Sequence, residues 1–398
     1  MNPPRTLFSR FIILAIGLLL THLAQSEAAT RPETPDIAGL VRRLGSTDFK
    51  VRELASRELF RIGLPAKQPL LEGANDPDPE VRRRCRDLLP RILEADRQAK
   101  LAAFLADTDG KLKHDLPGWE RYRKIAGEDD AARRFFADIQ KGDVAFLRDA
   151  EKDPDHAGER CGALCQLLIQ RQQAFQFRNG RVESTQIPLT EIAPMLLVAA
   201  DAHVRIPVQQ RYLFTNLLYQ PAVQENLRKS GISPFKKIVL AWMEHEVYDE
   251  TTSGSLFHVI NQLGLKEGLD MALKAVRSKK LKGPGLAGAL VTIGKFGDKE
   301  HVELMESFLD DKTAIGGFNF GRANGGNVGG NTQVRDAALA MLVRLTKQSA
   351  KDYGFAITEI QPALDHLMDY ANCLGFSSEE RRTKAFEKWK TWKAARKK

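Results

Sequence analysis

Residues 48–59 read DFKVRELASREL, and the same pattern returns twice further along the chain. The second copy, residues 78–89, reads DPEVRRRCRDLL, and the third, residues 331–342, reads NTQVRDAALAML. Each copy starts with Asp or Asn and then has Val-Arg, a small residue and a final Leu at fixed spacing. The first two copies lie 30 residues apart, a period typical of helical-repeat proteins. The pattern therefore predicts an all-α chain built from repeated helical units.

Three kinds of position recur in the copies, and each has a structural role. They are Asp48, Val51 and Arg52, then Asp78, Val81 and Arg82, and finally Asn331, Val334 and Arg335. The first residue is expected to accept a hydrogen bond from an unpaired backbone N–H at the helix start. The Val begins an apolar stripe, which in the third copy comprises Val334, Ala337, Ala338, Met341, Leu342 and Leu345. We assign the Arg to structure between repeats, where it reaches an acidic group or a carbonyl of the adjacent unit.

Turn residues separate these units, with Gly63 and Pro65 after the first copy and Pro77 and Pro79 around the start of the second. With these features, residues 37–95 resemble the HEAT-repeat family in its short-unit form, and residues 298–347 do so again. The resemblance implies an α-α superhelix, or solenoid, that is used for contact between proteins. We expect residues 96–297 to continue the solenoid with degenerate repeats.

The N-terminus has the features of a targeting segment. Arg5 and Arg10 precede or open an apolar run at 11–20, which is short for a membrane span, and small residues near Ala28 suit signal-peptidase cleavage. We predict a Sec-type signal peptide at 1–28 and a linker at 29–36, so that the protein is periplasmic or extracellular. An uncleaved membrane anchor is the alternative.

The charge of the chain is concentrated at its C-terminus. The net charge is +9 overall, of which residues 379–398 supply +6 and the remainder, once 1–28 are removed, only +2. A nucleic-acid-binding protein needs basic groups clustered on a binding face, so this distribution argues against nucleic acid as a partner. Residues 377–398 predict a basic amphipathic helix that caps the solenoid. The alternative is contact with an anionic membrane surface through Trp389, Trp392 and the basic tail.

The most unusual composition is that of residues 316–331, which contain seven Gly and four Asn. We expect a long loop inserted into the last unit, residues 298–376, because such residues do not hold a helix. One interpretation is a binding loop that presents Phe318, Phe320 and Arg322 to a partner. The other is a tolerated surface insertion. Elsewhere in the chain, the pair Asn179-Gly180 predicts a small hairpin within 177–188.

No catalytic, cofactor or metal-binding motif is present in the sequence. The segment His245 to Asp249 differs from H-E-x-x-H at its last position, and the four cysteines lack zinc or haem spacing, so we expect buried core thiols. The sequence therefore predicts an exported, non-enzymatic helical scaffold that binds another protein, without a cofactor. The alternatives are an enzyme or small-molecule binder with a concave cleft, and a peripheral membrane protein attached by its C-terminal helix.

Overall fold

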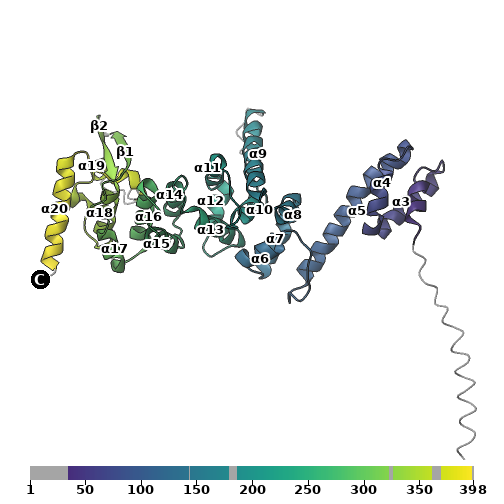
Figure 1. Ribbon diagram of the computed structural model, residues 1–398, viewed down its shortest axis with the longest axis horizontal. Coiled ribbons are helices and arrows are strands. Elements are labelled where there is room, and N and C mark those ends of the chain that lie inside the picture. The colour runs from purple at the N-terminus through teal and green to yellow at the C-terminus, as the bar shows by residue number, and fades with distance from the viewer. Residues whose placement is uncertain (1–34, 143, 179–185, 322–325, 361–368, 397–398) are drawn as a thin grey trace, which may run out of the picture. The chain divides into compact units, whose positions relative to one another are not determined.

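The computed structural model describes residues 35–142, 144–178, 186–321, 326–360 and 369–396. The predicted signal peptide, Arg322 and most of the hairpin predicted at 177–188 lie outside these residues. Helices account for most of the described chain, and the only sheet within it is a two-stranded hairpin (Figure 1). The predicted all-α class is therefore confirmed, apart from this hairpin.

The chain divides into two compact units, residues 1–100 and 101–398. The described elements of the first unit are α2 (Ile37–Arg43), α3 (Phe49–Ile62), η1 (Leu64–Ala66), α4 (Lys67–Gly73) and the larger part of α5 (Pro79–Ala106). Its core is a separate cluster of buried side chains, among them Leu44, Leu59, Leu70 and Cys85. The division falls inside α5, beyond the boundary predicted at residue 95.

The second unit holds the remaining elements. They are α6 (Trp119–Ala126), α7 (Asp130–Ile139), α8 (Ala145–Lys152), α9 (Ala157–Arg178), α10 (Leu189–Ala199), α11 (Val208–Leu217), α12 (Pro221–Arg228), α13 (Pro234–Glu246), α14 (Ser253–Leu263), α15 (Gly268–Arg277), α16 (Gly283–Phe296), η2 (Lys299–His301), α17 (Val302–Glu306), β1 (Ala314–Gly321), β2 (Asn327–Gln333), α18 (Val334–Leu345), η3 (Ala350–Tyr353), α19 (Ala356–Ile360), η5 (Ala371–Cys373) and α20 (Glu379–Arg396).

The first two copies of the repeated pattern begin their helices in the same way. Asp48 and Asp78 each accept a hydrogen bond, at 2.8 Å, from the backbone N–H two residues later, so both cap a helix as predicted. Ala55, Leu59 and Cys85 are buried, which confirms the predicted apolar stripe at these positions.

The Arg of these two copies holds the turn that precedes its own helix. Arg52 Nη1 donates to the carbonyls of Ser46 and Thr47 at 2.7 and 3.1 Å. Arg82 Nη1 donates to the two matching carbonyls, six and five residues before it, both at 2.7 Å. The expectation was a carbonyl or an acidic group of the adjacent unit. The carbonyls that accept these hydrogen bonds belong instead to the local turn. A looser ion pair, 3.5 Å between Arg52 Nε and Glu80, does reach the next copy.

The third copy differs from the first two at its start. Asn331 lies in β2, and the residue that caps α18 is Gln333, whose backbone N–H donates to Asp336 Oδ2 at 2.8 Å. The prediction that Asn331 caps this helix is therefore wrong, because the strand continues to Gln333 and the helix begins only at Val334. Arg335 reaches a different element, with Nη2 donating to Glu379 of α20 at 2.9 Å.

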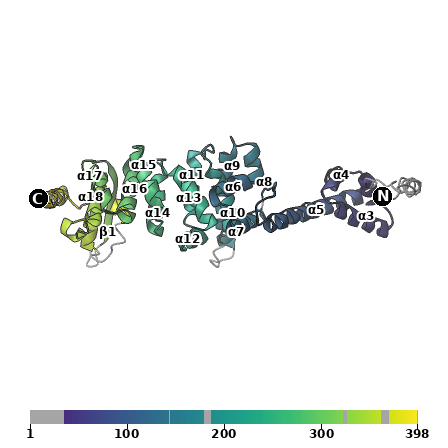
Figure 2. The ribbon, with the colours of Figure 1, turned by 90° about the horizontal axis from the view of Figure 1, so that it is seen from below.

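In the second unit, α14, α16 and α18 lie one after another, with α16 packed against both of its neighbours (Figures 1 and 2). Glycines on α16 allow this close approach. A Cβ at Gly288 would lie 2.9 Å from Phe257 Cβ of α14, and a Cβ at Gly294 would lie 2.3 Å from Met341 Sδ of α18. Almost all of α18 is buried, so its predicted amphipathic stripe is one part of a helix that is covered on nearly every side.

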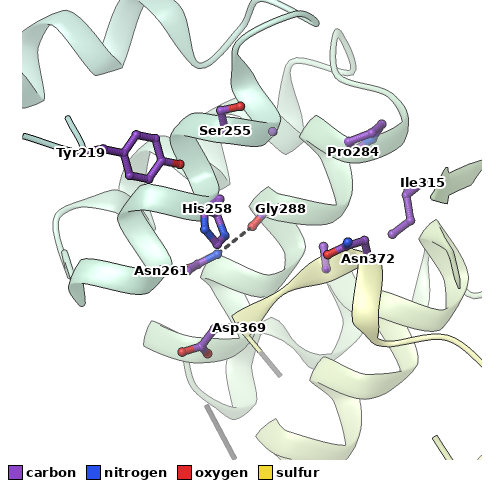
Figure 3. Close-up of a pocket in the computed structure, with 11 residues that line it drawn as sticks. Tyr219, Ser255, His258, Asn261, Pro284, Gly288, Ile315, Asp369 and Asn372 are labelled. Carbon is purple, nitrogen blue, oxygen red and sulfur yellow. Dashed lines mark hydrogen bonds between the residues drawn. The ribbon is translucent and has the colours of Figure 1, made fainter. Parts of the chain in front are cut away.

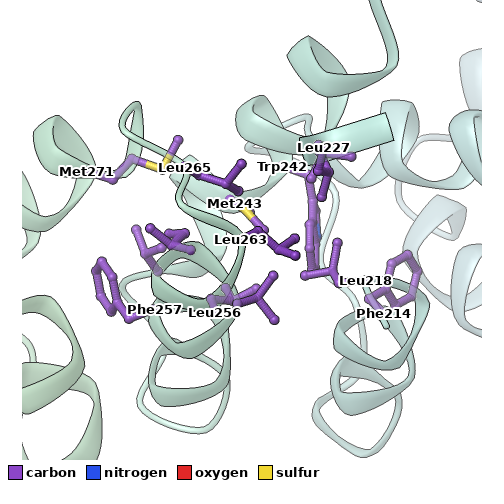
Figure 4. Packing of buried hydrophobic residues seen from close by; sticks show 14 of the residues in the cluster. Phe214, Leu218, Leu227, Trp242, Met243, Leu256, Phe257, Leu263, Leu265 and Met271 are labelled. Atoms are coloured by element: carbon purple, nitrogen blue, oxygen red, sulfur yellow. The ribbon is translucent and has the colours of Figure 1, made fainter. Parts of the chain in front are cut away.

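Earlier in the same unit, Trp242 of α13 lies within a cluster of apolar side chains that come from the segment α11 to α15 (Figure 4). Its ring is 1% exposed and lies near Leu218, Leu263 and Phe214, the last with ring centroids 6.1 Å apart. The cluster contains side chains from successive helices, so neighbouring helices share one continuous core.

The glycine- and asparagine-rich segment forms a hairpin where a loop had been expected. β1 and β2 pair antiparallel from Ala314 to Gly321, with a register shift between Ala314 and Gly316. Phe318 is 8% exposed and packs against Val328 and Ala356, and this packing explains why a segment without regular apolar alternation forms strands.

The C-terminal helix α20 packs on the second unit through one face. Trp389 and Ala385 are buried, while Phe386 and Trp392 are partly buried against the same core. Arg382 is 5% exposed and forms two hydrogen bonds with the fully buried carboxylate of Asp336, at 2.9 and 3.1 Å. The helix is thus held by a buried ion pair as well as by apolar contact.

All four cysteines, Cys85, Cys161, Cys165 and Cys373, are buried and none forms a disulfide. Burial raises the pKa of every one of them, for Cys85 to about 11 and for Cys165 to about 12. The prediction of buried core thiols is confirmed.

Candidate functional site

Helix α14 carries a polar stripe on an otherwise apolar sequence. Ser255, His258 and Asn261 recur at intervals of three residues, which places them along one side of the helix. The intervening residues Leu256 and Phe257, like others on the remaining sides, are buried in the core. Ser255 is exposed, His258 is partly buried and Asn261 is buried, so the stripe runs from the surface into the core, where burying a polar group is unfavourable.

The stripe forms one wall of a pocket of about 290 Å³, which we call the hairpin pocket. Its lining comes from α14, α16, β1 and η5, together with Tyr219 shortly after α11 and Asp369 just before η5 (Figure 3). The residues are Tyr219, Gly254, Ser255, His258, Asn261, Pro284, Gly288, Ile315, Asp369, Ala371 and Asn372. The volume lies near the lower end of the range for small-molecule sites, about 300–1,000 Å³, and matches a small ligand or one side chain of a larger partner.

Three hydrogen-bonding groups of this pocket have no hydrogen-bond partner among the described residues. Within the described chain, the hydroxyls of Tyr219 and Ser255 and the ring nitrogens of His258 make no hydrogen bond. The His258 ring instead packs against the ring of Tyr370, with centroids 4.6 Å apart, which fixes its orientation. These groups are therefore available to a ligand.

Asn261 lies deeper in the same wall and is 1% exposed. Its Nδ2 donates to the Gly288 carbonyl at 3.4 Å, and its Oδ1 is buried without a hydrogen-bond partner among the described residues. An unsatisfied buried acceptor costs about 1–3 kcal/mol, a cost that a hydrogen-bond donor on a ligand would offset.

The one carboxylate of the lining is already balanced by cations. Asp369 is paired with Lys295, and Arg344 Nη1 approaches it at 3.4 Å. Lys295 Nζ also donates to the Asn261 carbonyl at 2.7 Å, which links this ion pair to the polar stripe. Asp369 therefore offers no unpaired negative charge to a cationic ligand.

Two other titratable groups of the lining, His258 and Tyr219, are shifted toward their neutral forms. Burial lowers the pKa of His258 below its usual 6.5, and burial together with the nearby Tyr370 raises the pKa of the Tyr219 hydroxyl. The pocket thus offers uncharged donors and acceptors beside the apolar surface of Pro284 and Ile315. This lining suits an uncharged, hydrogen-bonding group.

The shift of His258 can be checked against a second histidine with the opposite shift. The carboxylate of Asp153, 3.0 Å from His156 Nδ1, raises the pKa of His156. We expect His258 to titrate below 6.5 and His156 above it in a histidine NMR titration, with each signal assigned by its His→Asn variant. His258 should reduce stability as pH falls through 6.5 and its folded-state pKa, whereas the contribution of His156 should be lost as pH rises through its own. A His258 signal at or above 6.5 would contradict the described burial.

A second, larger pocket of about 880 Å³ is lined mostly by charged and polar groups. Most of these groups are paired with one another or with the backbone. His114 lies 2.9 Å from Asp107, Arg123 lies 2.8 Å from Glu120, and Glu151 accepts from the Gly118 N–H at 2.7 Å. Because its charges are engaged in this way, this pocket is a weaker candidate than the hairpin pocket.

Phe318 and Phe320, which were predicted to contact a partner, do not line the hairpin pocket. Phe318 and Phe320 stack on each other, with ring centroids 5.0 Å apart, and Phe318 points into the hairpin's own core. Arg322 lies outside the described residues. Ser255, His258 and Asn261 were not predicted as site residues, although their regular spacing on an apolar helix is a signal that the sequence contains.

The structure also bears on the metal and membrane expectations. No group of three or more His, Cys, Asp or Glu side chains suited to a metal ion occurs among the described residues. In the part of the chain that the structure covers, no helix is both long and apolar enough to cross a membrane. Trp389, expected at a membrane surface under one alternative, is buried, while Trp392 is partly exposed and stacks on it.

No protein-family model matches this chain, and no curated protein is significantly similar to it in sequence. The function therefore has to be inferred from the residues and their geometry.

Proposed function

We propose that this protein is an exported, non-enzymatic HEAT-like α-solenoid that binds a protein partner in the cell envelope or outside the cell, through the hairpin pocket. The solenoid architecture is supported by the repeated cap and turn contacts of Asp48, Arg52, Asp78 and Arg82. It is also supported by the succession of α14, α16 and α18 around shared cores. Export is supported by the sequence of residues 1–28 alone.

The observation that carries the binding function is the set of unpaired hydrogen-bonding groups in the hairpin pocket. Tyr219, Ser255 and His258 present uncharged donors and acceptors beside apolar surface, and a rigid core of packed helices holds them in place. Preformed sites of this kind bind with little loss of conformational freedom. The arrangement fits recognition of a polar group on a partner, with the helices serving as the scaffold.

The proposal is tested by blocking the pocket on the intact protein. Ser255 is exposed at the pocket wall, so Ser255→Leu fills the pocket without disturbing the core. Gln262, exposed on the same helix but outside the pocket, provides the matched control Gln262→Leu. We expect Ser255→Leu to reduce crosslinked capture of a discrete protein partner from native cells at least tenfold, while Gln262→Leu captures it normally. Equal capture by both variants, or no protein partner for the unaltered chain, would refute the proposal.

A further inference from the structure

Among the described residues, one edge of the hairpin has no hydrogen-bonded partner strand. The outer side of β2 is covered, because Asn331 forms a β-bridge with Phe376 and its carbonyl accepts from Arg382 Nη2 at 2.9 Å. β1 pairs with β2 alone, and the backbone from Gly317 to Gly321 makes no hydrogen bond to any other described element. In an antiparallel ladder about half of these residues direct both their N–H and C=O away from β2. β1 therefore offers a free strand edge.

Beyond an irregularity at its start, this edge lacks the charges and prolines that proteins use to prevent strand addition. Residues 314–321 contain neither a charged residue nor a proline, and the only irregularity is the shift at Ala314 and Gly316. Gly317, Asn319 and Gly321 are exposed, and the glycines place no side chain in the way of an approaching backbone. Only another extended backbone supplies alternating donors and acceptors that match such an edge.

The free edge is continuous with the hairpin pocket. Ile315 of β1 lines the pocket, and a Cβ at Gly316 would lie 3.7 Å from Asn372 Cβ, which belongs to the same lining. Figure 3 shows Ile315 and Asn372 on one side of the pocket, opposite the α14 wall that carries His258. An extended chain on β1 would pass the pocket mouth, where one of its side chains can enter.

The polar groups of the pocket are an independent indication of a ligand. Asn261 is 1% exposed with an unpartnered Oδ1, and Ser255 and His258 in the same wall have no protein partner among the described residues. Because Asp369 is paired with Lys295, the pocket favours an uncharged side chain.

We infer that β1 and the hairpin pocket together bind an extended peptide segment of the partner protein. The segment adds to the hairpin as a third strand, paired with β1, and inserts one uncharged polar side chain, such as that of Asn, Gln, Ser or Thr, into the pocket. The inference rests on the proposed function and specifies the form in which the partner is recognised.

The test is selection of binders to the purified full-length chain from a display library of random twelve-residue peptides. We expect enriched peptides to lack proline over their central positions and to share one Asn, Gln, Ser or Thr. Backbone N-methylation of a synthetic binder at alternate positions should weaken binding at least tenfold, whereas methylation at the intervening positions should have little effect. Ser255→Leu should weaken binding to a similar extent, and Gln262→Leu should not.

Three results would overturn the inference. They are the absence of any enriched peptide, binders that tolerate N-methylation at every position, and concentration-dependent pairing of two copies of the chain that excludes the peptides. Failure here is distinct from failure of the proposed function. Suppose that the unaltered chain captures a protein partner, that Ser255→Leu does not, and that the peptides fail these criteria. The scaffold function would then stand, and strand addition would be refuted.

Discussion

Replacing Arg382 with alanine is expected to lower the free energy of unfolding by about 3–5 kcal/mol. The substitution leaves the carboxylate of Asp336, which is fully buried, without its two hydrogen bonds from the guanidinium. It also removes the donor to the Asn331 carbonyl at the covered edge of β2. Loss of one partner is costly because an uncompensated charge stays in an environment of low dielectric constant.

Hydrogen exchange of the α20 and α18 amides, combined with denaturant titration, would measure this loss. Lys390→Ala is the matched control, because Lys390 is exposed on the same helix and its removal should change stability by no more than about 0.5 kcal/mol. The double variant with Asp336→Asn and Arg382→Ala should lose less than the sum of the single variants, since neither charge then remains buried. Equal, small effects of Arg382→Ala and Lys390→Ala would show that the ion pair contributes little.

Trp242→Ala is expected to have an effect of similar size, about 3–5 kcal/mol, because it opens a cavity in the cluster of Figure 4. The indole Nε1 of Trp242 is buried and has no hydrogen-bond partner among the described residues. Trp242→Phe should therefore cost much less than Trp242→Ala. It keeps most of the ring and removes an N–H whose unsatisfied burial costs about 1–3 kcal/mol.

Urea-induced unfolding followed by circular dichroism distinguishes the two Trp242 variants. A Trp242→Phe variant as unstable as Trp242→Ala would contradict this expectation. The ring alone would then not account for the contribution of this residue.

Local sequence pattern was sufficient where the structure depends on local chemistry. Asp48 and Asp78 cap their helices because a short acidic side chain before a helix is close to the unpaired N–H groups wherever the chain lies. Cys85 was predictable as a core residue because it replaces a small apolar residue at a fixed helical position. The fold class followed from such signals.

The pattern was insufficient where the structure depends on residues distant in sequence. Nothing in the composition of 316–331 favours strands, and the hairpin is stabilised by packing of Phe318 on Ala356 and by the bridge between Asn331 and Phe376. The hairpin pocket likewise needs η5 to lie opposite α14, so that Asn372 and His258 share one cavity. The stripe on α14 indicated that some polar surface was needed there, but only the fold shows what faces it.

The state of the four cysteines has a consequence for how the protein would survive in an oxidising compartment. Oxidation and disulfide exchange proceed through the thiolate, and at Cys85 and Cys165 the raised pKa, to about 11 and about 12, keeps that form scarce at neutral pH. The thiols are also enclosed, so neither a small oxidant nor a disulfide-exchange enzyme has ready access to them. Once folded, the exported chain that we propose would therefore keep its four thiols reduced in such a compartment, and non-covalent contacts rather than disulfides would stabilise it there.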